Sequence, residues 1–154
     1  MTHTVYLSLG SNLGNRRQLL LDAIEKINKK VGNVVRQSSF YETKPWGFES
    51  ENLFLNAAVK VTTKLSSTEL LEVTQQIERE MGRRKKTTLN SQLSTPNYSD
   101  RPIDIDILLY DDLHVDLPEL KIPHPLMQER DFVLVPLREI IDADRELLQS
   151  HDSE

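Results

Sequence analysis

Apolar residues recur along the chain with two spacings, every second residue in some segments and every third or fourth in others. Side chains of a strand alternate between two faces, so the first spacing predicts strands and the second predicts amphipathic helices. The segments with strand spacing span residues 1–9, 34–41, 54–61 and 103–109. Helices are predicted between the turn 10–15 and Gly32, between Ser66 and Gly82, and across 132–141.

The order of these elements, β-α-β-β-α-β, predicts an α+β, ferredoxin-like fold. Its antiparallel sheet would carry helices on one face and leave the other face open, with the active site on the open face. Alternation in the third strand puts Phe54 and Asn56 on the face opposite Leu55 and Ala57. The open face is therefore the predicted place for ligands.

Two carboxylates, Asp104 and Asp106, alternate with Ile103, Ile105 and Ile107 in the fourth strand. The isoleucines would face the core, while both carboxylates would share the other face and repel each other. A cation between them would remove that cost, and Mg²⁺ prefers oxygen ligands from carboxylates and phosphates. The pair predicts phosphoryl chemistry. The alternative is a half-buried strand whose polar face meets water.

Composition limits the classes of protein to consider. The 154 residues fit one domain, which we expect over residues 1–141 with a tail at 142–154, and the formal net charge is −5. An acidic chain argues against a general nucleic-acid binder. The absence of cysteine fits a reducing cytoplasm. No apolar stretch approaches the roughly 20 residues that span a bilayer, so we expect a soluble protein without a membrane partner.

Several other polar residues have both a functional and a structural interpretation. The basic run Arg83–Lys86 is either a solvated cluster or part of a loop that closes over phosphates. His124 is held between two prolines, which restricts its backbone, yet a lone histidine is more often structural. Phe54 and Phe132 are either core residues or a stacking pair for a planar ligand. The turn 10–15 lacks the lysine of a phosphate-binding loop and is interpreted as structural.

Taken together, the motifs resemble those of the 6-hydroxymethyl-7,8-dihydropterin pyrophosphokinase family of folate biosynthesis. The similarity runs from about Val5 to Ile141, and its specificity comes from the order and spacing of the motifs. The segments that carry it are 10–14, 39–43, 54–59, 75–78, 82–83, 101–108, 122–125 and 130–137.

The resemblance implies transfer of a pyrophosphoryl group from ATP to the hydroxymethyl oxygen of the pterin, with release of AMP. It implies that Asp104 and Asp106 bind two Mg²⁺ ions and that Arg83 and Arg101 act with them as catalytic residues. The implied ATP-binding residues are Gln75, Glu78, Lys85, His124 and Arg130. The implied pterin-binding residues are Thr43, Pro45, Trp46, Phe54, Asn56 and Phe132.

One segment departs from the family pattern. Where the family commonly has Trp-Gly-Pro-Arg, this chain has Tyr98-Ser99-Asp100-Arg101 after a longer loop, so Tyr98 takes the place of the tryptophan as a lid. Two rival functions remain, a non-catalytic pterin- or nucleotide-binding module and an RNA-binding domain. The paired aspartates and the arginines favour the enzyme, and we expect it to act as a monomer.

Overall fold

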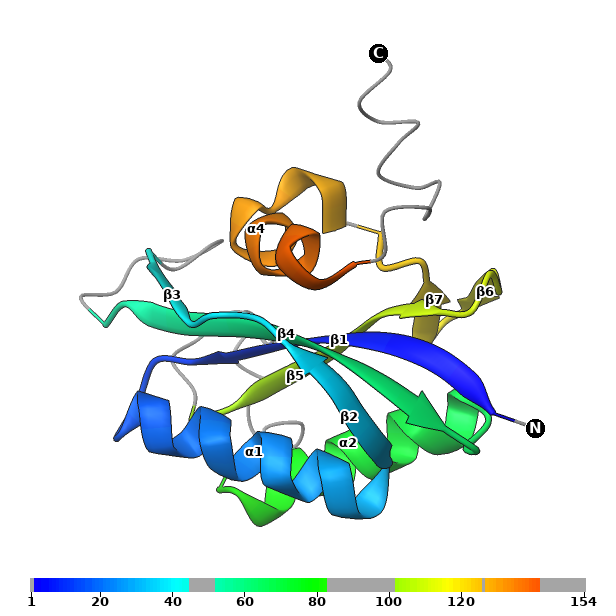
Figure 1. Cartoon of the computed structure of the whole chain (residues 1–154), viewed down its shortest axis with the longest axis horizontal. Helices are drawn as coiled ribbons and strands as arrows, with labels where there is room; N and C mark the ends of the chain where they lie inside the picture. Colours follow the sequence, from blue (N-terminus) through cyan, green and yellow to red (C-terminus); the bar gives the residue numbers. More distant parts are fainter. Residues whose placement is uncertain (1, 45–51, 83–101, 126, 142–154) are drawn as a thin grey trace.

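The computed structural model describes residues 2–44, 52–82, 102–125 and 127–141. Within them, a five-stranded antiparallel sheet has the order β2-β4-β1-β5, with β3 also paired to β4 (Figure 1). The predicted α+β, ferredoxin-like arrangement is confirmed. The strands are β1 (His3–Ser11), β2 (Gly32–Gln37), β3 (Tyr41–Thr43), β4 (Phe54–Thr63) and β5 (Asp104–Tyr110).

Two helices, α1 (Arg16–Lys30) and α2 (Ser67–Glu80), cover one face of the sheet (Figure 1). The side chain of Asn15 accepts a hydrogen bond from the Gln18 N–H and caps α1. The sequence Ser66-Ser67-Thr68-Glu69 is typical of a capping box, and Ser66 and Glu69 form one at the start of α2. Both helices bury an apolar stripe against the sheet, and this core contains Val5, Leu7, Leu9, Leu20, Ile27, Val59, Leu70, Ile77 and Ile105.

The strand predicted across 34–41 is two strands rather than one, β2 and β3. At the break, the Ser38 hydroxyl accepts a hydrogen bond from the Ala58 N–H, while the Ser38 N–H donates to the Ala58 carbonyl. A serine side chain thus replaces a backbone acceptor of the ladder, which lets the chain leave β4 and pair with it again further along. Such a local competition is not visible in the alternation of apolar residues.

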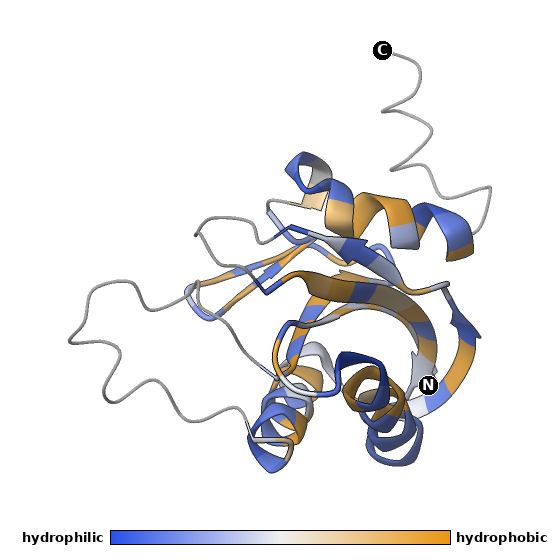
Figure 2. Ribbon diagram, turned by 90° about the vertical axis from the view of Figure 1, so that its left-hand side faces the viewer, coloured by the Kyte–Doolittle hydropathy of each residue, from blue (hydrophilic) through white to orange (hydrophobic). Residues whose placement is uncertain are grey.

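The second face of the sheet is only partly open. The helix α4 (Asp131–Ile140), preceded by the short η2 (Met127–Glu129), lies across it, and Figure 2 shows the sheet between α4 and the α1–α2 layer. The residues beneath α4 are apolar and include Tyr6, Ala58 and Leu108. The predicted ligand face is therefore confined to the part of the sheet that α4 leaves uncovered.

A small hairpin lies outside the main sheet and was not predicted. It consists of β6 (Val115–Leu117) and β7 (Leu120–Ile122), which pair with each other. After it, the His124 N–H donates to the Leu108 carbonyl at 3.1 Å, which fastens the chain beside β5. The hairpin therefore places its residues next to the carboxylates of β5.

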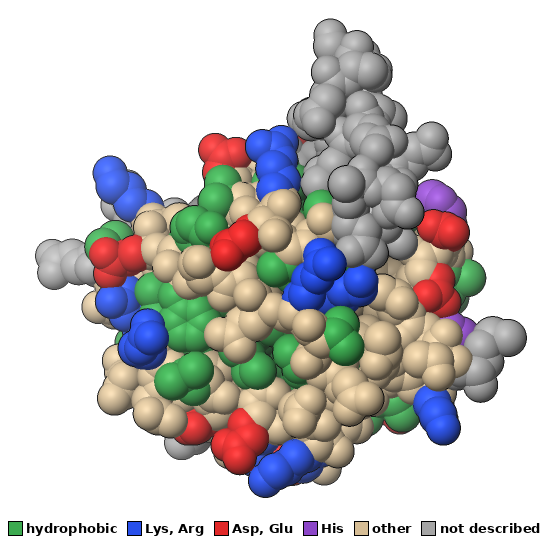
Figure 3. All heavy atoms as spheres, viewed as in Figure 1, with side chains coloured by type: hydrophobic (Ala, Val, Ile, Leu, Met, Phe, Trp, Pro, Cys, Tyr) green, Lys and Arg blue, Asp and Glu red, His purple; other side chains and the backbone are tan. Residues whose placement is uncertain are grey.

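On the face seen in Figure 3, basic and acidic side chains are interspersed. No helix among the described residues is both long and apolar enough to cross a bilayer.

Candidate active site

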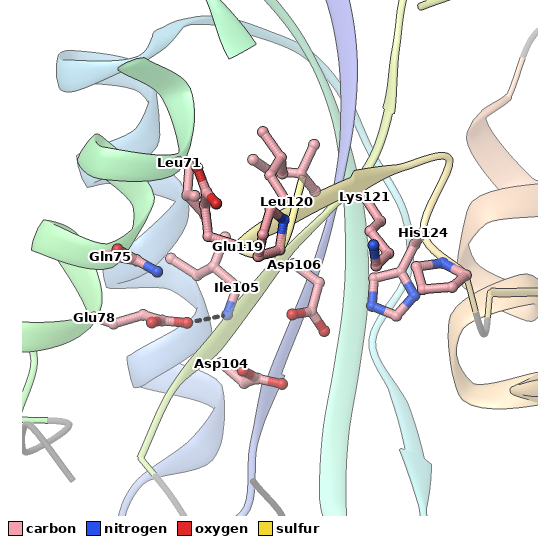
Figure 4. A pocket seen from close by; sticks show the side chains of 13 residues that line it. Leu71, Gln75, Glu78, Asp104, Ile105, Asp106, Glu119, Leu120, Lys121 and His124 are labelled. Carbon is pink, nitrogen blue, oxygen red and sulfur yellow. Dashed lines mark hydrogen bonds between the residues drawn. The ribbon is translucent and has the colours of Figure 1, made fainter. Parts of the chain in front are cut away.

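A pocket of about 370 Å³ lies between α2, β5 and the hairpin (Figure 4). Each of these elements contributes polar side chains to its wall, so the pocket is suited to a charged ligand more than to an apolar one. The polar side chains that line it are Gln75, Glu78, Asp104, Asp106, Glu119, Lys121 and His124.

Asp104 and Asp106 lie on the pocket side of β5, as the alternation predicts. Ile103, Ile105 and Ile107 are at most 6% exposed and face the core with α1 and α2, whereas both aspartates are half-buried. Both carboxylates point into the pocket (Figure 4). Their backbone partners on β1 are Gly10 and Ser8, which have little or no side chain to fill the space between them.

Glu78 completes the acidic side of the pocket. Its Oε2 accepts a hydrogen bond of 2.7 Å from the Ile105 N–H, shown as a dashed line in Figure 4. Because β5 is an edge strand, this N–H points away from β1 and needs an acceptor outside the sheet. Glu78 thus fixes α2 to the peptide between the two aspartates.

The donor set of this pocket fits Mg²⁺ only with help from a substrate. Among the described residues, no group of three or more histidine, cysteine or acidic side chains is placed to hold a metal ion. Two carboxylates still offer hard oxygen ligands at adjacent positions of one strand face. Mg²⁺ usually binds one or two carboxylates together with phosphates and water. Asp104 and Asp106 therefore fit a metal that arrives with a polyphosphate.

His124 closes the side of the pocket opposite α2. Burial and the neighbouring Arg130 lower its pKa to about 4, although Asp104 acts in the opposite direction. The imidazole is therefore neutral at pH 7 and serves as a hydrogen-bonding group rather than as a charge. Arg130 is 7% exposed and its guanidinium lies 5.7 Å from the centre of the Phe132 ring.

The hairpin residues are the part of the pocket that the sequence analysis missed. Lys121 lines the pocket, and its ammonium donates to Asp116 Oδ1 at 2.6 Å. This bond holds the pKa of Asp116 below its usual range. The signal was present as two short alternating runs, Val115–Leu117 and Leu120–Ile122, on either side of a Pro-Glu turn.

A second group of predicted residues lies on the same face of the sheet, across β1. Asn56 is 2% exposed and pairs through its backbone with Gly10, which also pairs with Asp104. The Asn56 amide donates to Thr43 Oγ1 at 2.6 Å and to the Tyr41 carbonyl at 3.3 Å. Within the described part of the chain nothing donates to its oxygen, so this is the Asn56 atom that would accept a hydrogen bond from a ligand.

Gly10 lets this second group approach β1 closely. A Cβ at Gly10 would lie 3.2 Å from the Asn56 side-chain oxygen and 3.4 Å from the Phe54 ring. Such contacts are tight, so a larger residue would displace Asn56 or Phe54. Phe132 belongs to α4, on the helix that crosses this face, and is half-buried.

The structure thus brings together most of the predicted residues in two neighbouring groups. Gln75, Glu78, Asp104, Asp106 and His124 line the pocket. Thr43, Phe54 and Asn56 form a contiguous set across β1, with Phe132 and Arg130 at the start of α4. Pro45, Trp46, Arg83, Lys85, Tyr98 and Arg101 lie outside the described residues.

Comparison with known families shows which family the chain is similar to. The sequence model of the 7,8-dihydro-6-hydroxymethylpterin-pyrophosphokinase (HPPK) family matches residues 6–142. A protein of Porphyromonas gingivalis named 2-amino-4-hydroxy-6-hydroxymethyldihydropteridine pyrophosphokinase is 51% identical over 137 residues, which cover 88% of this chain and 89% of that one. A Bacillus subtilis protein of the same name is 41% identical over 141 residues, covering 91% and 79%.

A solved structure supports the fold. The crystal structure of wild-type Plasmodium falciparum HPPK-DHPS with pteroate has a TM-score of 0.66 and 17% sequence identity. The match covers 90% of this chain and 39% of that longer chain. At this identity the likeness concerns the fold alone.

Proposed function

The chain belongs to the 7,8-dihydro-6-hydroxymethylpterin-pyrophosphokinase family, and from that premise we propose how it catalyses pyrophosphoryl transfer from ATP to 6-hydroxymethyl-7,8-dihydropterin in folate biosynthesis. The hydroxymethyl oxygen forms a bond to the β-phosphorus of ATP. The bond from that phosphorus to the oxygen bridging the α- and β-phosphates breaks. AMP leaves with the bridging oxygen, and the hydroxyl proton is released.

The observation that carries the mechanism is the position of Asp104 and Asn56 on either side of Gly10. Both residues pair with Gly10 through their backbones, so they share one face of the sheet and are separated by a single strand. Adjacent strands lie about 4.8 Å apart, which puts the two residues on the order of 10 Å from each other. A phosphate chain held at Asp104 would thus reach a small ring held at Asn56.

We assign the ATP side to the pocket beside β5. Asp104 and Asp106 would hold two Mg²⁺ ions together with the phosphates, and the bound metal would supply neutralisation of the triphosphate charge. Glu78 fixes the backbone between them through Ile105. Neutral His124 would donate a hydrogen bond to the nucleotide. We assign the remaining ATP contacts to Gln75, Lys85 and Arg130. Arg83 and Arg101 would stabilise the phosphate charge in the transition state.

We assign the pterin side to the group across β1. The Asn56 oxygen would accept a hydrogen bond from the polar edge of the ring, and Thr43 holds the Asn56 amide in the required orientation. Phe54 and Phe132 would stack on the two faces of the ring, because planar heterocycles stack favourably on aromatic side chains. Pro45 and Trp46 would complete the wall. The hydroxymethyl group would then lie above Gly10, toward the phosphates.

The experiment is to incubate the protein with Mg²⁺, ATP and 6-hydroxymethyl-7,8-dihydropterin and to separate the nucleotides by chromatography. We expect AMP and an equal amount of pyrophosphorylated pterin. ADP would indicate simple phosphoryl transfer and would contradict the mechanism. Pterin binding without turnover would support the non-catalytic binding module instead.

A further inference from the structure

We propose that Glu139 is a positioning residue for the pterin site, which it orders by joining the end of α4 to β3. The proposal rests on the assignment of Phe132 and Asn56 to pterin binding. It adds a role for Ser39 and Tyr41, two residues to which that assignment gives none.

The Glu139 carboxylate accepts three hydrogen bonds from the segment that leads into β3. The Tyr41 hydroxyl donates to Oε1 at 2.6 Å, the Ser39 N–H donates to the same oxygen at 2.9 Å, and the Ser39 hydroxyl donates to Oε2 at 2.9 Å. These bonds keep the pKa of the Glu139 carboxyl below its ordinary value and raise that of Tyr41. Bonds to an ionised acceptor are about twice as strong as neutral ones, so a single carboxylate fixes both residues.

The same segment orients Asn56 directly. Tyr41 pairs with Asn56 in the sheet, and its carbonyl accepts a hydrogen bond from the Asn56 amide. A continuous series of bonds therefore runs from Glu139 through Tyr41 to the group assigned to the edge of the pterin. A displacement of Tyr41 would turn the Asn56 amide away from its position above Gly10.

Phe132 lies at the opposite end of α4 from Glu139. It lies seven residues before Glu139 in α4, and seven residues correspond to two turns within about 20°, so both residues point to the same side of the helix. The helix thus carries a ring-stacking residue at its first turn and the carboxylate at its last. The bonds from Glu139 to β3 therefore set the distance between Phe132, which would stack on the ring, and Asn56, which would form a hydrogen bond to its edge.

Other contacts hold α4 on the sheet when Glu139 is removed. Arg36 donates to the Ile140 carbonyl at 3.0 Å, and Leu137 and Ile140 are at most 3% exposed beneath the helix. We therefore expect a variant at Glu139 to fold. Its effect should be on the alignment of the two pterin-binding groups and not on the presence of the helix.

The test compares pterin and ATP binding in Glu139→Ala, Glu139→Gln and Tyr41→Phe. We expect Glu139→Ala, which removes all three hydrogen bonds to the carboxylate, to weaken pterin binding by roughly tenfold and to change ATP binding by less than about twofold. Tyr41→Phe removes a single hydroxyl and should give a smaller loss. Glu139→Gln keeps one oxygen acceptor for Tyr41 and should restore part of the affinity.

The matched control is Glu80→Ala, which removes a carboxylate that bridges Lys26 and Lys30 on the other side of the sheet. It should leave pterin affinity within about twofold of the wild type. Unchanged pterin affinity in both Glu139→Ala and Tyr41→Phe, or equal losses for pterin and ATP, would overturn the proposal. Absence of AMP formation by the wild type would instead overturn the proposed function, and the pterin titrations would still test Glu139.

Discussion

The two faces of the central sheet are made by the same strands and the same backbone hydrogen bonds, yet they differ in what they carry. On β1, Val5, Leu7 and Leu9 face α1 and α2, and all three are at most 1% exposed. Tyr6 and Ser8 face the other way, where Tyr6 lies beneath α4 and Ser8 lies beside Asp106. One face is uniformly apolar, and the other changes from apolar to polar along its length.

This difference follows from what covers each face. Two helices with complete apolar stripes close the first face, so every inward position can be apolar and contributes to stability. A single helix covers the second face over part of its length, which leaves the end near Gly10 and Asp104 for ligands. We therefore expect substitutions on the first face to change the free energy of unfolding and those at the open end to change catalysis.

The largest expected effect at the open end is that of Asp104→Asn. The variant keeps the shape of the side chain and loses a charged metal ligand, so turnover should fall by at least about 100-fold while the melting temperature stays near that of the wild type. Steady-state kinetics and thermal unfolding measure the two quantities. Asp22→Asn, a half-buried position on α1, is the control. Near-normal turnover in Asp104→Asn would remove the metal assignment.

Phe132 tests whether α4 has two roles on the second face, as a cover of its apolar part and as a wall of the pterin site. Phe132→Ala should weaken pterin binding by roughly 1–3 kcal/mol if the ring stacks as nucleobases do on aromatic side chains. Fluorescence titration with the pterin measures the change. Val135→Ala, on the exposed side of the same helix, should have no such effect. Equal affinities in the two variants would assign Phe132 to the core alone.

Glu78 links the apolar face of the sheet to the pocket, because its helix α2 packs on that face while its carboxylate lines the pocket. Glu78→Ala leaves the Ile105 N–H without this acceptor and should lower the free energy of unfolding by about 1 kcal/mol. It should also raise the KM for ATP severalfold, because the backbone between the aspartates loses its support. Denaturant unfolding and kinetics should show neither change in Glu72→Ala, an exposed position of the same helix. A loss of stability with an unaltered KM would limit Glu78 to a structural role.

The last of these effects concerns the pH dependence of stability. An unfolded histidine titrates near 6.5, whereas His124 in the folded protein has a pKa of about 4. Between these values the unfolded chain binds more protons, so this contribution to stability is present above pH 6.5 and is lost as the pH falls toward 4. Urea unfolding without metal or nucleotide should show that the wild type loses more stability between pH 7 and 4.5 than His124→Asn does. Parallel losses would mean that His124 is not buried as a neutral group.

Much of this architecture could be predicted from the sequence, because alternation and capping are local properties. The exposure of Ile103, Asp104, Ile105 and Asp106 follows the predicted alternation, and the capping box at Ser66 is present. The predicted shared face of Asn56 and Asp104 also follows from period-two alternation once the strands pair through Gly10. The order of the strands in the sheet follows from the predicted order of elements, β-α-β-β-α-β, and not from any single residue.

The features that could not be predicted depend on contacts between distant segments. The break at Ser38 depends on a side-chain bond to Ala58, and the bonds of Glu139 to Ser39 and Tyr41 join residues about 100 positions apart. The acceptor role of Glu78 toward Ile105 could not be predicted either, because it exists only after α2 packs on β5. Local patterns contain no information about such pairs.

The most direct test of the contrast between the two faces is a comparison of Asp106→Ala on β5 with Leu7→Ala on the neighbouring strand β1, because the two side chains point to opposite faces of the sheet. We predict that Asp106→Ala lowers turnover by at least about 100-fold at unchanged stability. Leu7→Ala should lower the free energy of unfolding by about 2–5 kcal/mol and keep normal turnover per folded molecule. Loss of stability in Asp106→Ala with normal turnover, or loss of turnover in folded Leu7→Ala, would contradict the separation of stability and catalysis between the faces.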